Sequence, residues 1–176
     1  MRAARPLYAL GIKEGDRPAN AKEQLRREVT TSLVLTAALG RSSGLYQQLY
    51  EADLIDDGFG ARYQSGPGYG HTVIGGETKD PEQLHGRLRE GWARLRDKGL
   101  DPEDVIRVQR QAAGEFVQLF DSLEFIANSF LHYHFKEATL FDYMEMLQSV
   151  TPEEANERLR EHVRDEGMTL SVVVPS

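Results

Sequence analysis

The sequence contains no cysteine, and this absence excludes disulfide bonds, cysteine nucleophiles and zinc sites built on thiolates. It also fits a reducing compartment, so we expect a cytoplasmic protein. No stretch approaches the roughly 18 consecutive apolar residues of a membrane-spanning helix, and no membrane is expected as a partner. The basic N-terminal segment has an apolar run only from Leu7 to Ile12, which is too short for the hydrophobic region of a signal peptide.

Basic residues are also scarce, with 21 Lys and Arg against 28 Asp and Glu and a formal net charge of −7. Nucleic-acid binding requires concentrated Lys and Arg, and no basic stripe with interleaved aromatic residues is present, so nucleic acid is not an expected partner. The remaining composition is ordinary, at 40% hydrophobic and 28% charged residues. A chain of 176 residues with this composition predicts one soluble globular domain.

The first half of the chain predicts a strand, two helices and a hairpin. The strand covers 6–14, and apolar residues at every third or fourth position predict a helix over 21–39 that ends at Gly40. Ser42 or Ser43 is the expected N-cap of a second helix, which runs through Tyr50. Two apolar and aromatic runs on either side of a Gly-Pro-Gly turn then predict an antiparallel hairpin.

The second half predicts mainly helices. One begins at Pro81 and another at Pro102, each after an Asp that caps it, and the second extends through Leu131 either unbroken or with a break near Asp121. A short helix over 139–150, a capping box between Thr151 and Glu154, and a final strand in "LSVVVP" complete the pattern. This order predicts an α+β fold, in which a mostly antiparallel sheet has helices packed on one face.

The histidines raise the question of zinc. Residues 134–138 read H-F-K-E-A, one residue short of H-x-x-E-H, the inverted zinc-peptidase motif. On a helix, His132 and His134 would point about 200° apart, so they cannot both face one ion. His134 and Glu137 share a face, but the fifth position of the motif must bind metal, and Ala138 cannot. We therefore expect no metal or other cofactor in this chain.

Three further patterns favour structural explanations. The sequence G-R-S-S-G around Ser42 matches the nucleophile elbow of serine hydrolases, but that elbow needs a preceding strand, and a helix is predicted there. The glycine-rich stretch 65–76 lacks the Lys-Ser/Thr of a P-loop. Acidic residues between Glu51 and Asp57 lack the spacing of a calcium loop. No catalytic residue is assigned.

A larger pattern spans nearly the whole chain. It consists of G-x-S-S-x-L-Y-x-x-L at 40–49, the segment 54–59, T-x-D-P-E at 78–82, and the later segments "FDSLEFIANSF", "LFDYMEMLQSVTPEEANERL" and "LSVVVP". Taken in this order, these segments resemble the C-terminal, non-zinc-binding domain of insulinase/pitrilysin-type zinc peptidases, and they are similar to the bacterial processing-protease-like subunits. Residues 1–176 would form one such domain, with the mitochondrial-processing-peptidase-like metallohydrolase fold.

The resemblance also implies a role. Such a domain forms part of the wall of a peptidase chamber and docks against a zinc-bearing N-terminal domain or a homologous partner subunit, while peptides are the substrates. The chain itself would be inactive because it lacks H-x-x-E-H, and zinc would be held by the companion domain. The alternative is a standalone, non-proteolytic scaffold or interaction protein with the same fold.

The resemblance also points to residues that face substrate. Relatives that complete the active site carry an Arg and, seven residues later, a Tyr, but alignment on Leu49 places Tyr50 and Asp57 at these positions. Asp57 would repel a developing oxyanion, so a partner subunit would supply the pair. We expect Tyr50, Asp57 and Arg62 to face the chamber. Exposed apolar residues around Tyr143 and Met146 are expected to form interfaces, with self-association as a possible result.

Overall fold

The computed structural model describes residues 5–16, 18–66, 68–135 and 138–175. The elements, in chain order, are β1 (Leu7–Lys13), α1 (Ala21–Leu39), α2 (Gly44–Glu51), β2 (Gly60–Gly66), β3 (Tyr69–Glu77), α3 (Pro81–Lys98), α4 (Pro102–Gln118), the 3₁₀ helix η1 (Leu119–Asp121), α5 (Leu123–His134), α6 (Leu140–Ser149), α7 (Pro152–His162), the 3₁₀ helix η2 (Asp165–Gly167) and β4 (Met168–Val173). In the described part of the chain, none of the helices is both long and apolar enough to cross a membrane.

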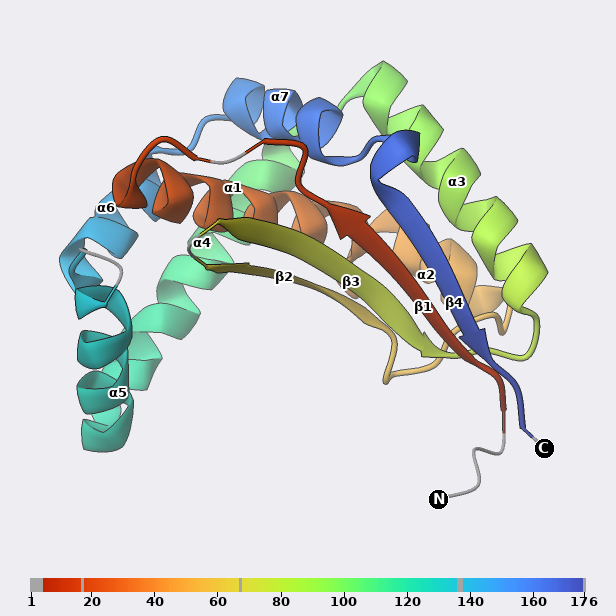
Figure 1. The fold of residues 1–176 in the computed structure, drawn as a ribbon, viewed down its shortest axis with the longest axis horizontal. Coiled ribbons are helices and arrows are strands. Elements are labelled where there is room, and N and C mark those ends of the chain that lie inside the picture. The colour runs from red at the N-terminus through yellow and green to blue at the C-terminus, as the bar shows by residue number, and fades with distance from the viewer. Residues whose placement is uncertain (1–4, 17, 67, 136–137, 176) are drawn as a thin grey trace.

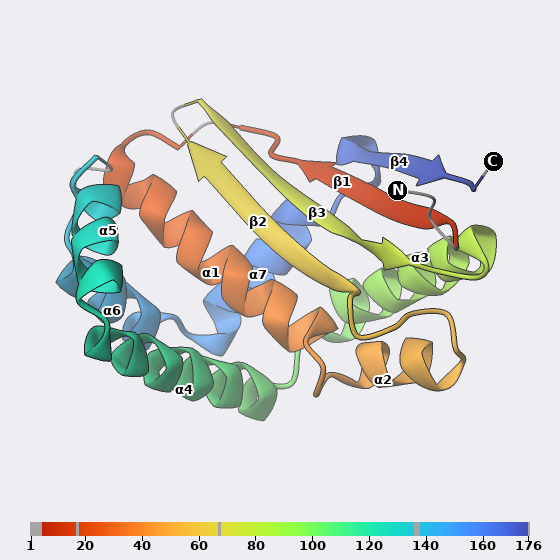
Figure 2. The same ribbon diagram turned by 90° about the horizontal axis from the view of Figure 1, so that it is seen from below.

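The four strands form one antiparallel sheet in the order β2-β3-β1-β4. The first and last strands of the chain are therefore neighbours, with Leu10 of β1 opposite Leu170 of β4. Helices α1, α3 and α7 lie on one side of the sheet, and the view from below shows the other side uncovered (Figures 1 and 2). The predicted α+β fold is confirmed.

Alternation along β1 determines which face of the sheet is buried. Tyr8, Leu10 and Ile12 point into the helical layer and are inaccessible to solvent, while Leu7 on the opposite face is exposed. The helices meet these strand residues with their own apolar stripes, including Leu84, Leu88 and Trp92 of α3. Full burial of each large apolar side chain contributes about 1.5–3 kcal/mol, so this layer is the main source of stability.

Local capping residues fix where the helices begin. The Asp80 side chain accepts a hydrogen bond from the backbone N–H of Gln83, and Pro81 occupies the first turn of α3. The expected break near Asp121 is present, because η1 separates α4 from α5 and Ser122 caps the new helix. Gly99 follows α3 with φ at 83°, a conformation that favours glycine.

Of the two hydrogen bonds in the capping box predicted at Thr151, one is present and the other is replaced. The Thr151 hydroxyl accepts a hydrogen bond from the backbone N–H of Glu154, but the Glu154 carboxylate binds the guanidinium of Arg26 instead of returning to the cap. A charged donor forms a stronger bond to carboxylate than a neutral amide does. A complete capping box occurs instead between Thr139 and Asp142, at the start of α6.

Candidate functional site

The three residues expected to face substrate lie on three different elements. Tyr50 lies near the end of α2, half exposed, with its ring stacked on that of Tyr46. Asp57 lies in the exposed turn before β2, where its backbone carbonyl accepts a hydrogen bond from Arg41 at 3.1 Å. Arg62 lies within β2, on the uncovered face of the sheet. Their common orientation toward a substrate chamber stays a prediction.

Arg62 borders a shallow depression of about 490 Å³ on that uncovered face. Leu7, Ala9, Val73 and Gly75 contribute to it from the two central strands, whereas Tyr50 and Asp57 do not line it. The surface combines small and apolar side chains with one guanidinium, so it could contact a peptide backbone or another protein surface. Among its described lining residues, Tyr8 carries a hydroxyl, but that side chain is fully buried on the helical side and lies 2.9 Å from His85 Nδ1.

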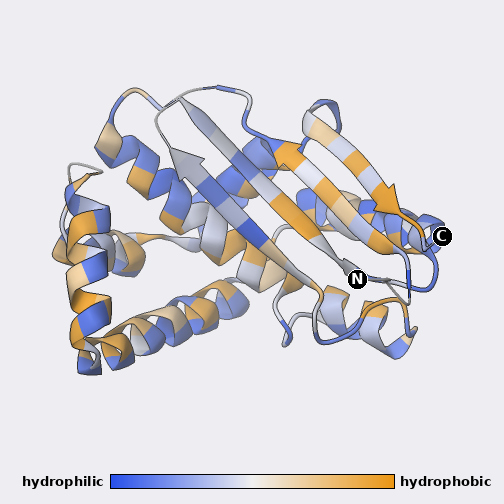
Figure 3. Ribbon diagram, turned by 60° about the horizontal axis from the view of Figure 1, so that its bottom comes forward, coloured by the Kyte–Doolittle hydropathy of each residue, from blue (hydrophilic) through white to orange (hydrophobic). Residues whose placement is uncertain are grey.

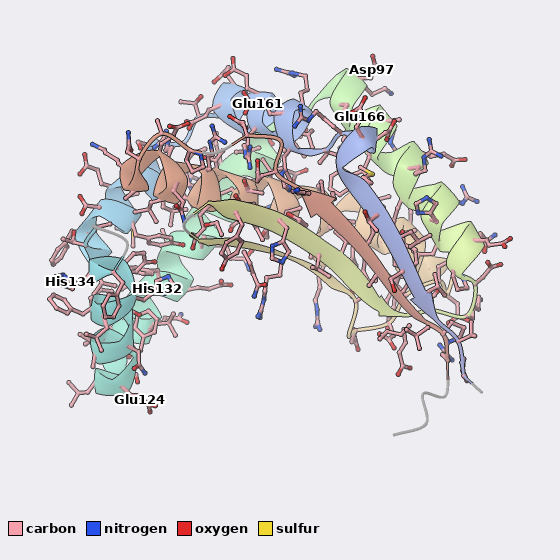
Figure 4. The ribbon with its side chains drawn as sticks, viewed as in Figure 1. Asp97, Glu124, His132, His134, Glu161 and Glu166 are labelled. Carbon is pink, nitrogen blue, oxygen red and sulfur yellow. The ribbon has the colours of Figure 1, made fainter. Side chains whose placement is uncertain are left out.

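The two histidines on α5 point away from each other, as their spacing predicts (Figure 4). The His134 ring stacks on Phe130 with centroids 6.2 Å apart, and the His132 ring meets the edge of Tyr133 at 5.2 Å. Glu137, the third member of the near-motif, lies outside the described residues. Within the described ranges, no three His, Asp or Glu side chains are placed to hold a metal ion.

The helical context of Ser42 contradicts a nucleophile elbow. The segment before it is α1, not a strand, and Gly40 and Ser43 serve as the C-cap of α1 and the N-cap of α2. The Ser42 hydroxyl accepts a hydrogen bond from the Arg107 guanidinium at 2.8 Å. Ser42 is therefore a surface residue of a helix-helix turn, and its partner Arg107 is a cation that cannot act as a base.

A buried polar cluster joins the end of β1 to α7, and sequence reasoning missed it. The Glu14 carboxylate accepts a hydrogen bond from Arg158, and the exposed fractions of their side chains are only 8% and 6%. Arg158 Nε also donates to the Thr31 hydroxyl of α1 at 2.7 Å. His162 is fully buried, with Nδ1 2.8 Å from Glu14 Oε1 and Nε2 2.7 Å from the Thr72 hydroxyl. The cluster thus links β1, β3, α1 and α7.

The contacts in this cluster hold the Glu14 carboxyl in its charged form, which does not leave it free to act as a base. Burial raises the pKa of the Glu14 carboxyl, but hydrogen bonds from His162 and Arg158 outweigh it and bring that pKa to about 2. Both partners are buried with Glu14: Arg158 supplies a guanidinium, and His162 Nδ1 lies 2.8 Å from Glu14 Oε1. Glu14 and Tyr63 also border a pocket of about 440 Å³, where burial raises the pKa of the Tyr63 phenol.

A signal for the cluster existed in the sequence. Arg158 and His162 share the helical stripe of Ala155 and Leu159, which are fully buried. Polar side chains on an apolar stripe require buried partners, and Glu14 directly after a strand was the available carboxylate.

Neither Tyr143 nor Met146, around which an apolar interface is expected, is an exposed side chain, and the interface itself stays a prediction. Met146 is buried in the core, and the Tyr143 ring packs 4.8 Å from that of Phe116. One group of large exposed apolar side chains lies along the end of α4, η1, α5 and the start of α6, at Val117, Leu119, Phe120, Leu123, Phe130, Leu131, Phe135 and Phe141. A second group lies on the strands and just after β4, at Leu7, Val73, Leu170, Val172, Val173 and Val174.

No protein-family model matches the chain. The chain is 31% identical over 170 residues to the uncharacterized zinc protease YmfH of Bacillus subtilis (strain 168), a match that covers 97% of this chain and 40% of YmfH. It superposes with a TM-score of 0.93 and 31% identity on an M16-like peptidase from Alicyclobacillus acidocaldarius, covering all of this chain and 42% of that one.

A third match extends over most of both proteins. The inactive peptidase domain of a zinc protease from Bordetella parapertussis superposes with a TM-score of 0.81 at 15% identity, covering all of this chain and 95% of that one. At this identity the likeness concerns the fold alone. The chain spans only about two fifths of the length of its two relatives at 31% identity.

Proposed function

Because this chain is a domain of the M16, or insulinase-type, peptidase family, we propose that it is the non-catalytic C-terminal domain of a zinc metallopeptidase. It forms part of the chamber wall and docks against a zinc-bearing domain and a partner subunit. The observation that carries the proposal is the match to YmfH, which extends over 97% of this chain but only 40% of that protein. The remainder of such a protein supplies what this chain lacks.

The chemistry belongs to the companion domain. That domain would hold the zinc ion, which would supply an activated water for attack on the peptide carbonyl. This chain contributes a rigid surface, since its sheet is backed by a continuous apolar core on the helical side. Arg62, on the uncovered face, contacts the peptide or the companion, and Tyr50 and Asp57 face the chamber without donating to the oxyanion. The partner subunit provides the Arg and Tyr for that purpose.

The second candidate function is a standalone scaffold without proteolytic activity. It is favoured by the uncovered face of the sheet and the exposed apolar side chains of α5, which can bind another protein without a catalytic group. A scaffold would bind other proteins through the same surfaces, but its binding would not increase peptide cleavage.

A reconstitution experiment separates these functions. The 176-residue chain is mixed with the part of YmfH that lies outside the 170 matched residues, and zinc-dependent cleavage of a peptide library is measured with each part alone and with both. We expect the two parts to form a complex and to cleave peptides faster together than either does alone. Complex formation without faster cleavage would favour the scaffold. Zinc-dependent cleavage by this chain alone would overturn the proposal.

A further inference from the structure

Helix α5 carries two apolar stripes, although a surface helix normally needs only one. At 3.6 residues per turn, successive residues are about 100° apart around a helix. Phe125, Ile126, Ser129 and Tyr133 then fall within an arc of about 100°, and all four are half-buried. Leu123, Ala127, Phe130, Leu131 and His134 fall within a second arc of about 100°, on a different side of the helix, and all five are exposed.

The half-buried stripe of Phe125, Ile126, Ser129 and Tyr133, here called the inner stripe, packs against other side chains of this chain. The Phe125 ring packs 6.1 Å from Phe116 and 6.3 Å from Phe120, and the Tyr133 ring packs 5.6 Å from Tyr143. These contacts hold α5 against the end of α4 and against α6. The inner stripe therefore accounts for the position of the helix.

The outer stripe, defined as Leu123, Ala127, Phe130 and Leu131, has no such explanation. Leu123 is 84% exposed and Phe130 is 59% exposed, and no residue of α5 is fully buried. Apolar (orange) residues recur along α5 although it lies at the margin of the molecule (Figure 3). A helix that is apolar on several sides is normally buried, and large apolar surface patches mark interaction sites. The anchors at 123, 127, 130 and 131 have the i, i+4, i+7, i+8 spacing with which a helix fills a groove.

Charge around the stripe limits what can cover it. From 111 to 135, where every residue is described, the charged Asp, Glu, Lys and Arg side chains are Glu115, Asp121 and Glu124, all acidic. Asp121 and Glu124 lie next to Leu123 in the chain, so two copies that met through this end of their outer stripes would bring carboxylates together, which costs binding energy. A partner with an apolar groove bordered by Lys or Arg would complement the surface.

We propose that the outer stripe of α5 is the surface on which the zinc-bearing companion domain docks. This inference rests on the proposed function and names the part of the chain that would bind the companion. The matched relatives are long enough to contain a second body larger than this domain, because the chain covers only 40% and 42% of them. That body is the occupant for which the chain leaves an apolar surface uncovered.

The test places this chain beside a companion domain in one polypeptide. The matched segment of YmfH is replaced by these 176 residues, so that the two parts are held at high effective concentration. Amide hydrogen exchange is compared between this chimera and the isolated chain. We expect exchange in 123–134 to slow at least tenfold in the chimera, because docking suppresses the local opening of α5.

A double variant tests the side chains themselves. L123Q/F130Q in the chimera should abolish the added protection of α5, while the control I106Q, at an exposed position on α4, should leave it unchanged. Circular dichroism of both variants checks that the fold is retained. Protection of α5 that persists in L123Q/F130Q would contradict the inference.

The remaining outcomes separate the two proposals. Slower exchange on the uncovered sheet face but not in α5 would overturn this inference and leave the proposed function standing. No slower exchange anywhere in the chimera would overturn the proposed function, and the docking surface with it. A dimer of the isolated chain that L123Q/F130Q dissociates, seen by analytical ultracentrifugation, would make a second copy the occupant and would also overturn the inference.

Discussion

The seam between β1 and α7 buries charge, whereas α5 exposes apolar surface. At the seam, Glu14, Arg158 and His162 are almost completely removed from solvent. On α5, Leu123 and Phe130 are mostly in contact with water. Both arrangements reverse the usual distribution, in which charged groups are solvated and large apolar side chains are buried.

The difference lies in whether the partners belong to the same chain. Each buried charge at the seam meets an opposite charge or a hydroxyl from another element of this domain, so the arrangement is complete. Within the described part of the chain, the outer stripe of α5 meets no comparable surface, so burial of these side chains adds little to the stability of the domain. Substitutions at the seam therefore test the stability of the domain, whereas substitutions in the outer stripe of α5 test its assembly with a partner.

The largest effect is expected from breaking the seam. Arg158→Met leaves the Glu14 carboxylate buried without its guanidinium partner, and loss of one member of a buried ion pair costs about 3–5 kcal/mol. Urea denaturation followed by circular dichroism measures the loss. Arg160→Met, an exposed position on the same helix, is the matched control and should change stability by less than about 0.5 kcal/mol.

A double-mutant cycle sharpens this result. Glu14→Gln combined with Arg158→Met removes both charges, so the pair should be less destabilised than the sum of the two single variants. Strictly additive losses would show that the two side chains do not interact.

The next effect is a dependence of seam stability on pH. The pKa of Glu14 is about 2 in the folded chain against an ordinary value of 4.5, so the folded state favours the charged form. Its contribution is fully present above about pH 5 and is lost as the pH falls toward 2, a total of about 3 kcal/mol. Denaturation curves between pH 2 and 7 should show this loss in the wild type. Glu14→Gln should lack that component, while Glu161→Gln, with a 70% exposed side chain, should keep it.

Phe116 of α4 packs against side chains of α5 and α6. Its ring packs against those of Phe120, Phe125 and Tyr143, so Phe116→Ala should cost about 2 kcal/mol, less than the usual cost in a central core. Hydrogen exchange should accelerate in 123–134 more than in β1. Phe141→Ala, at a 79% exposed position, is the control and should leave both regions unchanged. Equal acceleration in β1 would mean that α5 and the sheet unfold as one unit.

The sequence was sufficient for most of the fold because local signals were strong. Asp80-Pro81 and Asp101-Pro102 marked two helix starts, and apolar alternation marked β1. The capping box at Thr151 could not be judged locally, since the competing partner Arg26 lies more than a hundred residues away in the chain.

The site was less predictable for the same reason. Tyr50, Asp57 and Arg62 are close in sequence, but they lie on a helix, a turn and a strand that orient them differently. Met146 reads as an exposed residue on a short helix, but α1 and α4 both pack against α6 and bury it. Whether the outer stripe of α5 is exposed depends on which neighbouring helices cover it, and sequence periodicity does not show that.

The smallest effect is expected from Leu123→Ala in the isolated chain. The same substitution at Leu88, which is fully buried in α3, should cost about 2–5 kcal/mol because it leaves a cavity in the core. At Leu123 few contacts are lost and alanine favours the helix slightly more than leucine, so unfolding free energy should change by less than about 0.5 kcal/mol. Equal losses at the two positions, measured by urea denaturation, would mean that this chain itself covers the outer stripe. If Leu123→Ala leaves the free energy of unfolding nearly unchanged, the leucine adds nothing to the stability of its own domain. Its side chain is then available for contact with another domain or another molecule.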